Sequence, residues 1–148
     1  MSVALAPPDL MSLAEALRPG LLKVSRRLRQ ESQKAGVPAQ DALLLGFIQK
    51  NPGVGVCELA DVEQTSRPTM SSHVKRLEAA GWIARRRDDK DARRSGLVIT
   101  RAGEKRIETI RRLRNDWLAA RLSRLSAQER ERLALAAEPL LKLMMVEP

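Results

Sequence analysis

Apolar residues recur at helical spacing along the first third of the chain, in a segment otherwise rich in Arg, Lys, Glu and Gln. They keep roughly to one face and comprise Leu10, Leu13, Leu17, Leu21, Val24 and Leu28. This spacing predicts an amphipathic helix, which the sequence Ala-Gly-Val-Pro ends after Lys34. Proline lacks the amide hydrogen that a helix interior needs, so we expect Pro19-Gly20 to kink or restart this helix.

The middle of the chain contains three shorter helical patterns. Apolar residues at 43–48 predict a helix that ends at Asn51-Pro52-Gly53, and residues 56–62 predict another short helix. After a turn, Ser66 is expected to cap a third helix that runs to about Ala80 and ends at Gly81. The second and third of these helices are therefore expected to be joined by a turn.

The pattern then changes, because the sequences WIARRR and SGLVIT favour β-strands and flank the polar segment DDKDAR. We interpret them as a two-stranded wing with an exposed loop. Helix, helix, turn, helix and β-hairpin is the order of a winged helix-turn-helix. The sequence therefore predicts a mainly α fold with a small β-wing.

Two further helices are expected after the wing. Thr100 is a candidate cap for the first, and Ser126 and Glu129 match a capping box for the second, which Pro139 should kink. On one side the first carries Ile107, Ile110, Trp117, Leu118 and Leu125, and the second should bury Leu133, Leu140, Leu141 and Met144. These apolar residues, together with those of 10–28, exceed what two helices packed on each other would conceal. A twofold pairing of chains would hide the surplus, and a helical hairpin covering its own lobe is the alternative.

Length and composition exclude several classes of protein. A chain of 148 residues, 43% hydrophobic and 30% charged, fits one soluble domain with a core. No apolar run approaches the roughly 18 residues of a membrane span, and the N-terminus lacks the basic region of a secretion signal. One cysteine, Cys57, excludes an internal disulfide. We therefore expect a cytoplasmic protein.

The charge is more informative, because 27 basic and 18 acidic residues give a net charge of +9. Residues 67–114 hold 15 basic and 6 acidic side chains, an excess of nine, whereas the charges of the remaining residues cancel. Such a region favours a polyanionic partner. The aromatic residues are limited to Phe47, Trp82 and Trp117, which disfavours modules that stack single-stranded bases on aromatic rings. Duplex nucleic acid is the favoured partner.

The helix after Ser66 has the surface that a major groove admits. At 100° per residue, Met70, Val74 and Leu77 form an apolar stripe. The polar face opposite is small and basic and consists of Pro68, Ser72 and Lys75, with Ser71 and Arg76 beside it. Short side chains let a helix approach base edges, while lysine and arginine bind guanines or phosphates. An isolated charged face would ordinarily be a solvated surface, but the residues that follow change this interpretation.

Arginines and one lysine crowd the predicted hairpin, whose tip cannot bury them. They are Arg85, Arg86, Arg87, Lys90, Arg93 and Arg94. A narrow minor groove concentrates negative potential and attracts an arginine at a wing tip, and Asp91 could hold Arg93 in place by a bidentate pair. A calcium loop at 88–91 is disfavoured, because the glycine and glutamate that it requires are misplaced.

With these features the sequence resembles the MarR-type winged-helix transcriptional regulators over nearly its whole length. The landmarks are a Leu-Glu-x-x-Gly-x-Ile exit from the recognition helix, an Asp-x-Arg wing tip and a Thr-x-x-Gly entry into the next helix, represented by Leu77, Glu78, Gly81, Ile83, Asp91, Arg93, Thr100 and Gly103. The resemblance implies a single domain over 1–148. It places the winged lobe at 38–100 and dimerisation helices at 10–35 and 101–145.

That family implies an obligate homodimer whose first, fifth and sixth helices interlock, leaving two lobes to bind a pseudo-palindrome. We expect a repressor whose recognition helix enters the major groove and whose wing enters the minor groove. The expected DNA contacts are Arg67, Pro68, Ser71, Ser72, Lys75, Arg76, Arg86, Arg93 and Arg94. The resemblance also implies a small anionic, often phenolic, effector, for which Arg27, Phe47 and Trp117 are candidate contacts. A winged-helix module that binds an acidic protein partner is the alternative function.

Catalysis and metal binding find little support in the sequence. His73 lies beside Ser71 and Ser72 on one helix, where the side chains diverge too far for a hydrolytic triad, so we expect no enzyme and no cofactor. One histidine and one cysteine do not supply the ligands of a zinc site. We expect His73 to pack at the edge of the helix-turn-helix or to touch phosphate. Cys57 is expected to be a small packing residue rather than a peroxide sensor.

Overall fold

The computed structural model describes residues 9–87, 90 and 95–145, and within them the predicted mainly α fold with a β-wing is confirmed. The elements follow in the order α1 (Leu10–Lys34), α2 (Ala39–Lys50), α3 (Val56–Val62), α4 (Arg67–Ala79), β1 (Ile83–Arg87), β2 (Ser95–Ile99), α5 (Arg101–Leu122) and α6 (Ala127–Lys142). The two strands form one antiparallel sheet.

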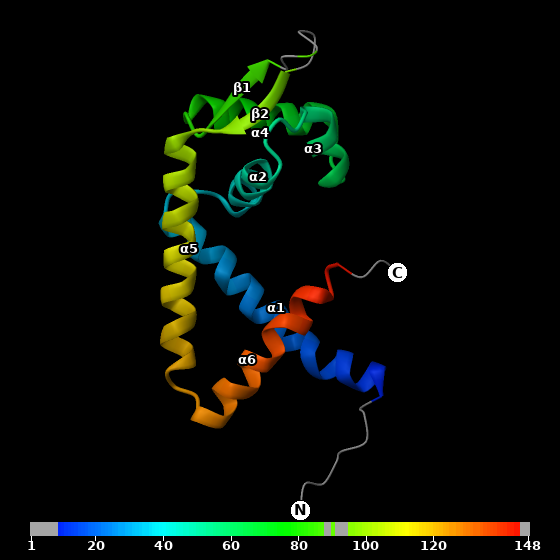
Figure 1. Cartoon of the computed structure of the whole chain (residues 1–148), viewed down its shortest axis with the longest axis vertical. Coiled ribbons are helices and arrows are strands. Elements are labelled where there is room, and N and C mark those ends of the chain that lie inside the picture. The colour runs from blue at the N-terminus through cyan, green and yellow to red at the C-terminus, as the bar shows by residue number, and fades with distance from the viewer. Residues whose placement is uncertain (1–8, 88–89, 91–94, 146–148) are drawn as a thin grey trace, which may run out of the picture.

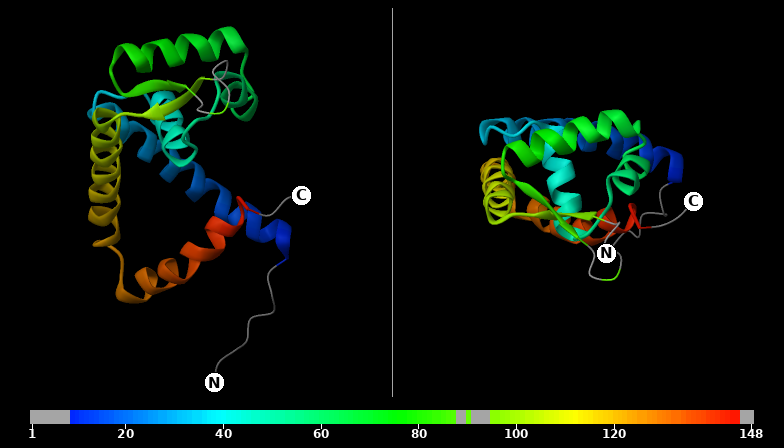
Figure 2. Two further views of the ribbon diagram at one scale, coloured as in Figure 1. Left: turned by 45° about the horizontal axis from the view of Figure 1, so that its top comes forward. Right: turned by 90° about the horizontal axis from the view of Figure 1, so that it is seen from above.

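The elements α2, α3, α4, β1 and β2 gather at one end of the molecule (Figure 1). The long helix α5 runs away from this lobe, and α6 turns back from its far end toward α1, so that three helices outline an open frame below the lobe (Figure 2). Among the described residues no helix combines the length and apolar character that a membrane span requires.

Helix α1 is continuous from end to end. Asp9 caps it by accepting a hydrogen bond from the Ser12 amide at 3.2 Å, and Pro19 lies within the helix. Of the two outcomes expected at Pro19-Gly20, the restart is therefore wrong and the kink stays a prediction. The C-terminal end of α1 enters the lobe, where Glu31 is buried and pairs with Arg27 at 2.7 Å and with Lys34 at 2.9 Å.

The core lies inside the lobe, between α2, α4, the sheet and the first half of α5. Helix α2 contributes Leu44, Leu45 and Ile48, which have the spacing of a buried helix face and are inaccessible to solvent. The other buried apolar residues are Ala35, Val37, Val54, Leu59, Ala60, Met70, Val74, Leu77, Ile83, Leu97, Ile107 and Ile110. This core fixes α4 and the wing in one rigid unit.

The wing strands pair from Ile83 opposite Ile99 to Arg87 opposite Ser95. The loop before α3 adds a further bridge, because the Gly53 amide donates to the Leu97 carbonyl at 2.8 Å and the Leu97 amide to the Val54 carbonyl at 2.8 Å. Strand β2 is thereby attached to the lobe by two backbone hydrogen bonds, both made by Leu97.

Helix α6 has the predicted capping box, in which Ser126 and Glu129 exchange side-chain and backbone hydrogen bonds. The prediction that this helix buries its leucines is wrong for the single chain, since none of its residues is buried. Leu133 is 47% exposed and Leu141 67%, and Met144 beyond the helix is 88% exposed. The reason is geometric: α6 diverges from α5 (Figure 2), and its leucines Leu133, Leu135 and Leu141 stay exposed.

Candidate nucleic-acid interface

Helix α4 lies along the outer edge of the lobe, away from α6 (Figure 2). Ser66 caps it by accepting a hydrogen bond from the Thr69 amide at 3.3 Å. Met70, Val74 and Leu77 face the core, as the sequence predicts. The predicted polar face therefore points outward. Its exposed members are Pro68, Ser72, Lys75 and Arg76, Ser71 is half-buried, and Arg67 is exposed at the start of the helix.

The groups on this face differ in what they offer a ligand. The Ser72 hydroxyl donates to the Pro68 carbonyl at 3.2 Å, which leaves its lone pairs as acceptors. Within the described part of the chain, no ion pair or hydrogen bond engages the Lys75 ammonium. Lys75 is therefore available to bind a phosphate or a guanine.

Arg76 is exposed on α4 and also makes contacts with the protein that the sequence did not indicate. Its Nε donates to Asp41 Oδ2 at 3.1 Å, and its Nη2 donates to Asp41 Oδ1 and lies 2.7 Å from His73 Nδ1. The hydrogen bond to Asp41 raises the pKa of Arg76 above its ordinary value, against the opposing effect of desolvation. The head group of Arg76 is thus engaged with the protein, while the expected DNA contact stays a prediction. His73 is half-buried beside it.

Sequence analysis missed Asp41, which is only 1% exposed. A signal was present, because Asp41 stands three, four and seven residues before Leu44, Leu45 and Ile48, on the buried face of α2. A carboxylate in an apolar stripe requires a cationic partner. The partner lies 35 residues away in sequence, a separation at which helical spacing gives no information.

The wing presents its arginines next to α4. Arg85, Arg86 and Arg87 are exposed on β1, and Arg85 Nε donates to Glu78 Oε1 at 2.9 Å, which links the wing to the recognition helix. Arg86 has no ion-pair partner in the described ranges. The predicted tip residues Asp91, Arg93 and Arg94 lie outside the described residues.

Part of the basic excess in 67–114 serves the fold instead of a polyanion. Arg106 donates to the Ala35 carbonyl at 2.9 Å and its guanidinium lies 5.6 Å from the centre of the Trp82 ring. Arg114 donates to the Leu28 carbonyl at 3.0 Å. These arginines of α5 attach α1 to the lobe, so the surface available to nucleic acid is narrower than the charge count suggests.

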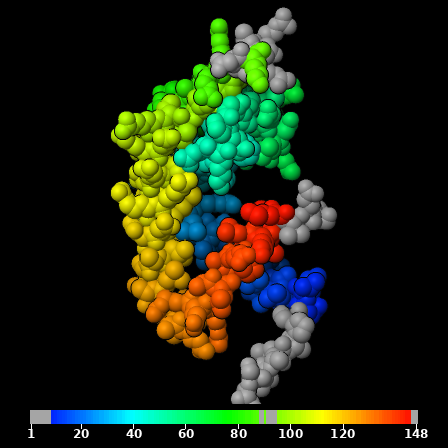
Figure 3. All heavy atoms as spheres, viewed as in Figure 1, coloured from blue at the N-terminus to red at the C-terminus, as the bar shows by residue number. Residues whose placement is uncertain are grey.

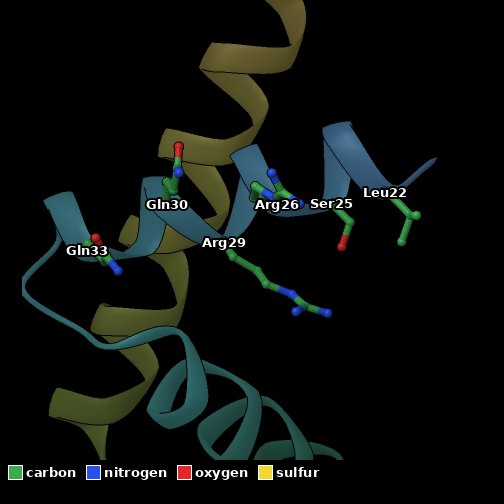
Figure 4. A pocket seen from close by; sticks show the side chains of 6 residues that line it. All are labelled: Leu22, Ser25, Arg26, Arg29, Gln30 and Gln33. Carbon is green, nitrogen blue, oxygen red and sulfur yellow. The ribbon is translucent and has the colours of Figure 1, made fainter. Parts of the chain in front are cut away.

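Of the predicted effector contacts, Arg27 and Trp117 lie together and Phe47 lies in the lobe. Arg27 lies 5.8 Å from the Trp117 ring and pairs with Glu31, while Phe47 packs against the lobe core. A pocket of about 310 Å³ instead lies beside α1, which supplies all six lining residues: Leu22, Ser25, Arg26, Arg29, Gln30 and Gln33. Figure 4 shows these side chains, with Arg29 extending from the helix on the side of α2.

The remaining candidate groups are the single cysteine and possible metal ligands. Cys57, which the sequence suggested as a small packing residue, is exposed on α3. No group of three His, Cys, Asp or Glu side chains suited to a metal ion occurs among the described residues.

An outward helix held by a helix-turn-helix, next to a basic two-stranded wing, defines the winged helix-turn-helix class of DNA-binding proteins. A family model described as MarR family matches residues 35–94. The chain is 32% identical over 105 residues to the HTH-type transcriptional regulator BilQ of Clostridium symbiosum, covering 71% of this chain and 73% of that protein. The chain belongs to the MarR family of DNA-binding transcriptional regulators, whose members are not enzymes, as the sequence predicts.

Solved structures agree with this assignment. A transcriptional regulator from Thermotoga maritima superimposes with a TM-score of 0.77 at 26% identity, covering 91% of this chain and 95% of that one. A mutant of MepR from Staphylococcus aureus, bound to an oligodeoxyribonucleotide, has a TM-score of 0.66 at 21% identity, with 89% and 97% covered. The second likeness concerns the fold alone.

Proposed function

We propose that this chain is a cytoplasmic repressor that binds pseudo-palindromic duplex DNA as a homodimer. Each lobe inserts α4 into the major groove and its wing into the adjacent minor groove. The observation that carries this proposal is the shared surface of α4 and β1, where Lys75 and Arg86 are exposed and unpaired among the described residues. Ser71 and Ser72 would approach base edges, Pro68 would contact a thymine methyl, and Arg67 would bind the backbone.

The apolar surface of the helical frame supports the dimer. Exposed large apolar residues concentrate on α1 and at the C-terminal end, including Leu13, Leu17 and Leu21 of α1 and Leu133, Leu135 and Leu141 of α6. A space-filling view shows a recess between the lobe and α6, with α1 behind it (Figure 3). Soluble monomers rarely expose so much contiguous apolar surface, and a second copy of the frame would cover it.

Selecting genomic DNA fragments that bind the purified protein tests the function and the dimer together. We expect the recovered sites to contain inverted half-sites about one helical turn apart, roughly 34–36 Å, and the protein to sediment at twice 16.5 kDa. Binding to random duplex with no preferred sequence would favour the alternative, an interaction module for an acidic protein. A monomer that ignores duplex DNA in weak buffer would end the proposal.

The pocket beside α1 supports release by a small anion. Arg26 and Arg29 contribute two positive charges to its wall. Burial lowers the pKa of the nearby Arg114, and repulsion by Arg29 lowers it further. An aromatic carboxylate would relieve this repulsion and fill the apolar side at Leu22.

Benzoate is a suitable probe for this site. We expect it to weaken DNA binding about tenfold, within the range of ordinary allosteric coupling, and Arg29→Ala to abolish the response without changing binding in its absence. Lys23→Ala is the control, because Lys23 is an exposed cation of α1 outside the pocket. A mobility-shift titration measures each constant. A benzoate response that survives Arg29→Ala would reject this pocket.

A further inference from the structure

A buried carboxylate beneath the recognition helix has no part in the DNA contacts described above. Asp41 lies in the first turn of α2 and is 1% exposed. Both its oxygens bind the Arg76 guanidinium of α4 in a bidentate pair. Planar fork-to-fork pairs of this kind fix the orientation of both partners as well as their separation.

The pair provides a constraint that the apolar contacts of α4 do not. Met70, Val74 and Leu77 attach the helix to the core, but dispersion contacts have little directional preference and tolerate small rotations. Arg76 stands near the C-terminal end of the helix, so its tie to α2 fixes the rotation of α4 about its axis. That rotation determines the direction in which the side chains of Ser71, Ser72 and Lys75 point toward a groove.

His73 extends the same network along α4. A guanidinium has no acceptor atom, so Nδ1 of His73 accepts the hydrogen bond from Arg76 Nη2, at 2.7 Å. The same Nδ1 lies 3.9 Å from Asp41 Oδ1. One buried carboxylate thereby organises two polar side chains on the recognition helix.

The burial of Asp41 also limits where the head group of Arg76 can move. If this head group moved to a phosphate, the buried Asp41 carboxylate would lose its bidentate partner and keep only His73 Nδ1, 3.9 Å away, which is strongly unfavourable. We propose that Asp41 is a positioning residue for sequence recognition: it holds Arg76, and through it His73, so that α4 meets the groove in one orientation while Arg76 is withheld from the DNA. This role rests on the proposed function and refines it, because it separates the residues that contact DNA from those that aim them.

The substitution Arg76→Lys tests this role, because lysine keeps the charge and loses the fork. Positioning predicts that the ratio of affinities for the selected site and for random duplex falls by about tenfold, while the salt dependence on random duplex stays unchanged. A direct phosphate contact predicts near-normal binding by Arg76→Lys. Lys75→Ala is the matched control, since loss of a true phosphate contact weakens binding to both duplexes and lowers the salt slope by about one.

Asp41→Asn completes the design, because the asparagine side chain has the same shape without the charge. We expect it to reproduce the loss of preference, and the double variant with Arg76→Lys to be no worse than either single variant, as for residues of one network. If the wild type prefers the selected site over random duplex and both single variants keep that preference, the positioning role is overturned while the proposed function stands. A wild-type protein without any preference would overturn the proposed function as well.

Folding is monitored independently of DNA. Thermal unfolding by circular dichroism shows whether Asp41→Asn folds; if it does not, Arg76→Lys decides, because its side chain is half exposed and tolerates the change. The NMR signal of the Arg76 Nε–H group should be protected from solvent exchange in the free wild-type protein. Rapid exchange of that hydrogen would contradict the pair itself.

Discussion

Replacing Gly103 by alanine should lower the free energy of unfolding by about 3 kcal/mol, at the upper end of typical overpacking penalties. A β-carbon at this position would lie 2.2 Å from the Trp82 carbonyl oxygen and 2.7 Å from Ile99 Cγ1. The carbonyl cannot easily retreat, because it accepts the Thr100 amide hydrogen bond at 3.0 Å. For a chain of this length we expect the thermal midpoint to fall by about 10 °C, as measured by calorimetry.

Gly46→Ala is the matched control for this substitution. Gly46 also lies within a helix, α2, but a β-carbon there would meet nothing within 4 Å. Alanine has the higher helix propensity, so this variant should be as stable as the wild type or more stable by up to about 1 kcal/mol. Equal destabilisation at both positions would show that the close approach of Trp82 to Gly103 does not determine stability.

Features encoded by neighbouring residues were predictable from the sequence. Ser66, Thr100 and Ser126 cap their helices as expected, because a capping side chain needs only the amides of the next turn. Gly81 has a positive φ of 77° after α4, the conformation that favours glycine at a helix end. The apolar periods of α1, α2 and α4 likewise identified the helices, since amphipathic spacing is a local property.

Features that depend on distant segments were not predictable. The sequence showed Arg76 on the polar side of α4 but not that Asp41 of α2 would take its guanidinium. It counted Arg106 and Arg114 among the cations for a polyanion, whereas both donate to backbone carbonyls near the end of α1. A helical wheel gives the direction in which a side chain leaves its own helix. It does not give the partner that the fold places there.

Some arginines hold the fold and others are available to bind phosphate, and the second group leads to the prediction with the largest expected change in DNA affinity. DNA affinity should fall about 10³–10⁵-fold between 50 and 200 mM salt, if the dimer makes roughly 6–10 phosphate contacts. The cause is the release of condensed counterions when lysine and arginine neutralise phosphates. Fluorescence anisotropy with a labelled duplex across this range gives the slope of log affinity against log salt. A nearly flat slope would contradict the interface of α4 and the wing.

Single substitutions separate the cations that bind DNA from those that hold the fold. Arg93→Ala, at the predicted wing tip, should weaken binding and reduce the salt slope by about one while leaving the thermal midpoint unchanged. Arg106→Ala should do the reverse, lowering the midpoint with little change in slope, because its guanidinium binds the Ala35 carbonyl and stacks on Trp82. Both variants lose one positive charge, so a general effect of net charge would change both slopes alike. Opposite outcomes can arise only from where each guanidinium is placed.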